Sequence, residues 1–120
     1  MAKPGPKAPP EQVAQYERAL AALPEVERKG AAMPYTSVNG NMFSVLGADG
    51  VLGLRLSAAD REAFLGQYGG KLYESYGAVM KEYVAVPAAL LADTAAMATW
   101  MGKSWDYAKG LKAKATTRKN

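Results

Sequence analysis

The sequence predicts one α+β domain, an antiparallel sheet flanked by an N-terminal, a middle and a C-terminal helix. Two observations predict this fold: apolar residues recur at helical spacing near both ends of the chain, and an Asn-Gly pair separates two strand-like runs. In addition, the predicted strands are grouped by hairpins and do not alternate with helices, which favours α+β over a parallel α/β sheet. A length of 120 residues suits a single domain.

The first helix is expected to begin at Pro10 or Glu11, because proline is tolerated in a first turn and an acidic side chain suits the helix dipole there. Pro24 is expected to end it, since its ring disfavours helix at the preceding residue. The predicted buried stripe has three- and four-residue spacing and consists of Val13, Tyr16, Leu20 and Leu23.

A three-strand meander is predicted next, over residues 35–38, 42–46 and 51–56. Asn39-Gly40 supplies the positive φ angles that a two-residue type I′ hairpin turn requires. In the third strand, leucines alternate with other residues, so one face of the sheet is expected to be apolar.

The middle helix is expected to follow Ser57, a good N-cap residue, and to stop at Gly69-Gly70. A second hairpin is predicted from residues 72–75 and 79–86, and Pro87 then leads into a short helix. The last helix is expected to be capped by Asp93 or Thr94. Its buried face is predicted to hold Met97, Trp100, Met101, Ser104, Ala108 and Leu111.

Charge is unevenly distributed along the chain. Fifteen Lys and Arg residues against 11 Asp and Glu residues give a net charge of +4. Residues 1–10 carry +2 and residues 103–120 carry +5, so residues 11–102 carry −3, from 7 basic and 10 acidic side chains. We therefore expect a proline-rich, disordered segment over 1–9, a folded domain over 10–112 and a basic C-terminal tail over 113–120.

The absence of His and Cys excludes much familiar chemistry. Without imidazole or thiolate there is no Ser-His-Asp triad, cysteine nucleophile or ordinary structural zinc site, so no cofactor and no metal are expected. Carboxylate-based acid–base catalysis or small-ligand binding stays open as an alternative, with candidates Asp60, Glu62, Glu74 and Glu82. No signal peptide and no apolar run of about 20 residues is present, which predicts a cytoplasmic protein without membrane contact.

Several short motifs, in this order and spacing, resemble the TfoX/Sxy N-terminal-domain family over about residues 12–112. The motifs are Glu27-Arg28-Lys29, Pro34-Tyr35-Thr36-Ser37, Asn39-Gly40-Asn41-Met42-Phe43-Ser44, Leu54-Arg55-Leu56-Ser57, Tyr76-Gly77, Met80-Lys81-Glu82-Tyr83-Val84, Val86-Pro87 and Trp105-Asp106-Tyr107. Where many members have a Met-Phe-Gly-Gly run, this chain has Ala32-Met33-Pro34-Tyr35, and it resembles a stand-alone branch. The resemblance implies a fold related to the YjbR-like double-wing group, for which DNA binding has been proposed. It implies no enzyme activity, cofactor or metal.

The leading prediction is a small, non-enzymatic binding or regulatory domain that contacts nucleic acid weakly and non-specifically through its phosphates. The alternative is a protein-interaction module without a nucleic-acid role, which binds either a second copy of itself as a homodimer or another, unidentified protein. The residues expected to make the contacts are Arg28, Lys29, Tyr35, Arg55, Tyr83, Lys109, Lys112, Lys114, Arg118 and Lys119.

Overall fold

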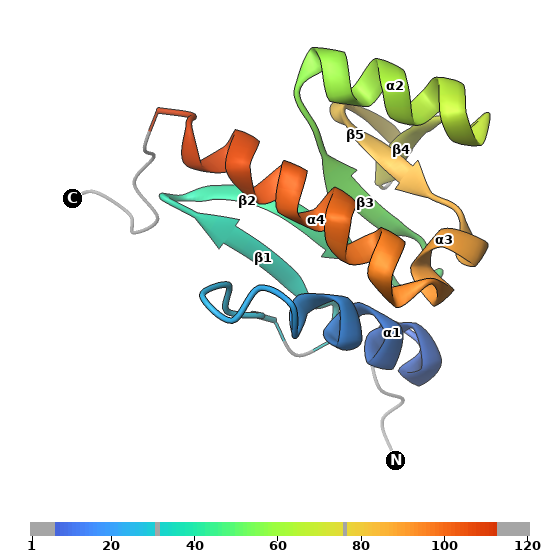
Figure 1. Ribbon diagram of the computed structural model, residues 1–120. Coiled ribbons are helices and arrows are strands. Elements are labelled where there is room, and N and C mark those ends of the chain that lie inside the picture. The colour runs from blue at the N-terminus through green and yellow to red at the C-terminus, as the bar shows by residue number, and fades with distance from the viewer. Residues whose placement is uncertain (1–6, 31, 76, 113–120) are drawn as a thin grey trace.

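A computed structural model describes residues 7–30, 32–75 and 77–112 of the protein (Figure 1). These residues form a five-stranded sheet and four helices, which confirms the predicted α+β class. The elements in chain order are α1 (Pro10–Leu20), β1 (Tyr35–Val38), β2 (Asn41–Leu46), β3 (Leu52–Arg55), α2 (Ala58–Tyr68), β4 (Leu72–Ser75), β5 (Ala78–Val86), α3 (Ala88–Ala92) and α4 (Thr94–Lys109).

The sheet has the strand order β1-β2-β3-β5-β4, and all neighbouring strands are antiparallel. The meander of β1, β2 and β3 and the separate hairpin of β4 and β5 are both as predicted. At the β1–β2 turn, Asn39 has φ 53° and Gly40 has φ 79°, as a type I′ turn requires. The hairpin joins the meander through β5, which leaves β4 at one edge of the sheet and β1 at the other.

All the helices contribute to one core on one face of the sheet. The cross-strand pairing places Leu46, Leu52 and Val86 in one row, and Leu54 and Val84 in the next, all of them buried. In Figure 1, α4 runs across the sheet, where it contacts β1, β2 and β3, while α2 lies against β5. The helices supply the core residues Tyr16, Ala19, Leu20, Phe64, Leu90, Leu91, Met97, Trp100, Met101 and Ala108.

The predicted capping residues act as expected. The Ser57 hydroxyl accepts a hydrogen bond from the Asp60 N–H at 3.2 Å, and the Asp93 carboxylate accepts one from the Ala96 N–H at 3.2 Å. Gly69 ends α2 in the left-handed conformation, with φ 60°. These contacts satisfy backbone groups that helix ends otherwise leave unpaired.

Several element boundaries differ from the predictions by one to three residues, and Leu111, predicted on the last helix, lies beyond the end of α4 and is only partly buried. Helix α1 ends at Leu20 and does not reach Pro24, because the chain continues as tight turns in which the Ala22 and Leu23 N–H groups bond to Ala19 and Leu20. Strand β3 covers four residues and ends at Arg55, because the chain then turns away from the sheet into α2. In the segment over 1–9, Ala8 is buried and donates its N–H to the Ala32 carbonyl at 2.8 Å.

The opposite face of the sheet is shaped by small residues. Gly53 in β3 pairs with Val45 on one side and with Ala85 on the other. The ring of Tyr73 lies directly over Gly53, such that a β-carbon at this position would be 2.7 Å from the Tyr73 Cγ atom. Tyr73 is almost completely buried.

Candidate functional site

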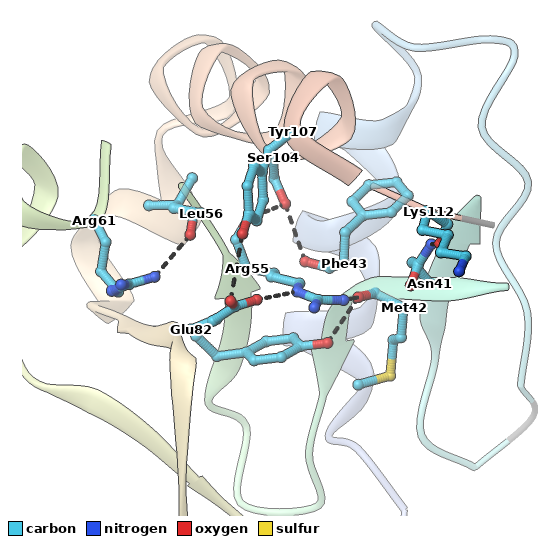
Figure 2. Close-up of polar contacts among 11 residues, drawn as sticks. Asn41, Met42, Phe43, Arg55, Leu56, Arg61, Glu82, Ser104, Tyr107 and Lys112 are labelled. Carbon is cyan, nitrogen blue, oxygen red and sulfur yellow. Dashed lines mark hydrogen bonds and ion pairs between the residues drawn. The ribbon is translucent and has the colours of Figure 1, made fainter. Parts of the chain in front are cut away.

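Strands β2 and β3 stop pairing near the end of β3, and polar side chains fill the gap between them (Figure 2). Because β3 ends at Arg55, it no longer pairs with the first residues of β2. The Met42 carbonyl in β2 instead accepts a hydrogen bond from the Tyr83 hydroxyl at 2.7 Å and a longer one from the Arg55 guanidinium at 3.4 Å. Side chains thus take over the bridging role of the missing strand.

An ion pair lies at the centre of this gap. Arg55 Nε donates to a Glu82 carboxylate oxygen at 2.7 Å, and the other carboxylate oxygen accepts from the Tyr107 hydroxyl of α4 at 3.3 Å. The Arg55 guanidinium also lies 5.8 Å from the centre of the Tyr83 ring. Burial raises the pKa of the Tyr83 phenol, opposed by the positive charge of Arg55. Arg55 and Tyr83, both predicted to contact a partner, therefore hold the two halves of the sheet together.

A buried hydroxyl cluster fixes α1 on the sheet. The Tyr16 hydroxyl shares a hydrogen bond of 2.5 Å with the Ser44 hydroxyl, which shares another of 2.5 Å with Thr36. None of the three side chains is exposed. Burial raises the pKa of Tyr16 to about 12, although the two hydroxyls and the charge of Arg28 act in the opposite direction. Its members lie in three different elements, so no local pattern in the sequence predicts this cluster.

This cluster predicts a loss of stability at high pH. The Tyr16 pKa is near 10 in the unfolded chain and about 12 in the folded one, so between these values only the unfolded chain ionises. Stability should be unaffected below pH 10 and should fall as the pH rises toward 12, by about 2–3 kcal/mol in total. Urea unfolding of the wild-type protein and of Tyr16→Phe at pH 8, 10 and 11.5 measures this contribution. If the free energy of unfolding changed with pH in the same way in both proteins, this contribution of Tyr16 would be contradicted.

Three of the predicted contact residues come together at the β1 edge. Lys29 pairs with Tyr35 through two backbone hydrogen bonds of 2.8 and 2.9 Å, and its ammonium donates to the Ser37 hydroxyl at 3.1 Å. Arg28 instead forms an ion pair of 3.1 Å with Glu17. Of these cations, the exposed Lys29 is the one available for an external anion.

The basic C-terminal segment begins at the same hairpin. The buried Asn41, at the start of β2, donates its side-chain N–H to the Lys112 carbonyl at 3.0 Å. Figure 1 shows the end of α4 beside the β1–β2 turn. Asn41 pairs with Val38 across the turn. The residue before Val38, Ser37, accepts the hydrogen bond from the Lys29 ammonium. Lys29 and Lys112 therefore both contact the turn end of this hairpin.

We call this region the basic end of the molecule and define it by Lys29, Lys109, Lys112 and the β1–β2 turn. Residues 28–48 contain no acidic side chain. The Lys109 ammonium lies 3.3 Å from Asp106 and 3.9 Å from the centre of the Trp105 ring. The predicted residues Lys114, Arg118 and Lys119 lie outside the described residues and add three more positive charges directly after this point in the sequence.

The four candidate carboxylates are distributed over three elements. Asp60 and Glu62 belong to α2, Glu74 to β4, and Glu82 is committed to Arg55. A hollow of about 170 Å³ opens beside β4 and β5; it is lined by Asp49, Val51, Lys71, Leu72, Tyr73, Glu74 and Ala85. Within the described residues, no group of three or more acidic side chains is arranged to hold a metal ion. None of the helices in this part of the chain has the length and apolarity needed to cross a bilayer.

No protein-family model, curated protein or solved structure matches this chain.

Proposed function

We propose that this protein is a small, non-enzymatic binding domain that contacts nucleic acid through its phosphates, using the basic end and the tail that follows it. The proposal includes the relation to the TfoX/Sxy N-terminal-domain family, which rests on the motifs given above. It also includes a cytoplasmic location, where nucleic acid is accessible. The partner is recognised by charge, so no base sequence is selected.

The observation that carries the proposal is the hydrogen bond from Asn41 to the Lys112 carbonyl. It joins a segment with a net charge of +5 over residues 103–120 to a hairpin without acidic residues. Lys112, which precedes the tail in the sequence, is therefore held at the same hairpin whose Ser37 accepts a hydrogen bond from Lys29. Clustered cations on one side of a small domain are the electrostatic footprint of a polyanion-binding protein.

A pair of charge-matched variants tests the proposal. Lys29→Gln/Lys112→Gln removes two cations from the basic end, whereas Lys71→Gln/Lys81→Gln removes two exposed cations from the β4–β5 region. Each lost phosphate contact should weaken binding about tenfold at 50 mM salt, so the first variant should bind a labelled DNA duplex about 100-fold more weakly. The second should change the dissociation constant less than about threefold. Equal losses in the two variants would show that overall charge matters and the basic end does not.

A further inference from the structure

The two tryptophans of α4 have different environments. Trp100 is buried, donates its indole N–H to the Tyr68 hydroxyl at 3.1 Å, and meets the Phe64 ring edge-on at a centroid distance of 5.0 Å. Trp105 packs only partly against the core and keeps a minor part of its surface exposed. Core packing thus accounts for Trp100 but leaves part of the Trp105 surface without a structural role.

The surface beside Trp105 is open. One turn earlier in α4, apart from the two neighbouring residues and the backbone of the helix itself, no heavy atom lies within 4 Å of the point where a β-carbon of Gly102 would be. Side chains on a helix lean toward its N-terminus, so the Trp105 side chain leans toward the turn that contains Gly102. Any larger residue at 102 would fill this space. The glycine therefore leaves a notch in the helix surface one turn before Trp105.

A lysine side chain that is partly exposed to solvent lies over one face of the Trp105 indole. The Lys109 ammonium, on a side chain that is 44% exposed, lies 3.9 Å from the ring centre and is held there by Asp106. A cation at this distance makes a non-covalent cation–π contact with the ring. Stacking of a nucleobase on an indole is a stronger interaction than an exposed cation–π contact, so a base can displace this lysine.

We propose that Trp105, with the notch at Gly102, is a stacking site for one base of a single-stranded nucleic acid. This inference rests on the proposed function, because the basic end brings the strand to α4. Once displaced from the ring, the Lys109 ammonium pairs with a phosphate of the same strand. Single strands are favoured over duplexes, since the bases of a duplex already stack on each other and do not offer a free face.

The test separates stacking from charge. The probes are a twelve-nucleotide oligo-dT strand and an abasic strand with the same number of phosphates, each titrated by anisotropy and by tryptophan fluorescence. The wild-type protein should bind oligo-dT about tenfold more tightly than the abasic strand, and only oligo-dT should quench the indole emission. Trp105→Leu should lose this tenfold preference and keep its affinity for the abasic strand. In Trp105→Phe, which retains Trp100 alone, the quenching should disappear.

A glycine pair provides the matched control. Gly102→Gln fills the notch and should weaken oligo-dT binding about fivefold without changing abasic binding. Gly66→Gln makes the same substitution at an equally open position of α2 and should have no effect on either probe. Equal affinities of the wild-type protein for the two strands would overturn the stacking site and leave the phosphate contacts intact. Absence of binding to both strands would overturn the proposed function itself.

Discussion

Replacement of Phe64 by Ala is expected to lower the free energy of unfolding by about 3–5 kcal/mol, the largest single effect that we predict. Phe64 is the one fully buried residue of α2. Its ring lies 4.8 Å from the Tyr68 ring and 5.0 Å from the Trp100 ring, measured between centroids. Removing it leaves a cavity among aromatic side chains and removes the main attachment of α2 to the rest of the core.

Urea unfolding followed by far-UV circular dichroism measures this loss, and the tryptophan emission of the folded variant should shift to the red as water reaches Trp100. Glu62→Ala, an exposed change on the same helix, is the control and should change stability by less than about 0.5 kcal/mol. A loss below about 1 kcal/mol for Phe64→Ala would mean that other contacts hold α2 in place.

Replacement of Gly53 by Ala should destabilise the protein by about 2–3 kcal/mol, although only one methyl group is added. The new β-carbon would lie 2.7 Å from both Cγ and Cδ2 of Tyr73. These atoms are at the base of the ring, so a side-chain rotation of Tyr73 does not easily relieve the clash, and the backbone of β4 must shift relative to β3.

The same substitution at Gly66 is expected to have the opposite effect on stability. Gly66 lies in the last turn of α2 with open space around it, so Gly66→Ala should stabilise the protein by about 0.5–1 kcal/mol through helix propensity. A double-mutant cycle identifies the cause at position 53: in a Tyr73→Ala background, Gly53→Ala should become nearly neutral. An unchanged penalty in that background would place the strain elsewhere in the sheet.

Local signals in the sequence were sufficient to predict most elements. The Asn39-Gly40 turn, the Ser57 cap and the Gly69 stop each depend on a few adjacent residues, and each occurs as predicted. The burial of Leu52, Leu54 and Leu56 followed from strand periodicity in the same way. Such features are encoded by short-range chemistry, which a single sequence displays directly.

The polar centre of the sheet could not be predicted in this way. The Arg55–Glu82 pair spans 27 positions and exists because β5 pairs with β3, a choice that depends on the packing of the whole sheet. Without that pairing, Glu82 resembles a carboxylate on a solvated strand. For the same reason, Arg55 and Tyr83 looked like free contact residues, whereas Lys29 and Lys112 came together only through contacts to the β1–β2 hairpin.

The salt dependence of DNA binding tests the central claim most directly. If about five cations of the basic end and tail each neutralise one phosphate, the logarithm of the association constant should fall with the logarithm of salt concentration with a slope of about −4.5. Between 50 and 200 mM salt, affinity for a duplex should therefore drop about 500-fold, and deletion of residues 113–120 should flatten the slope by about 2.7, the share of three cations. An unchanged slope after that deletion, or no binding at 50 mM salt, would contradict the proposed role of the basic end and its tail.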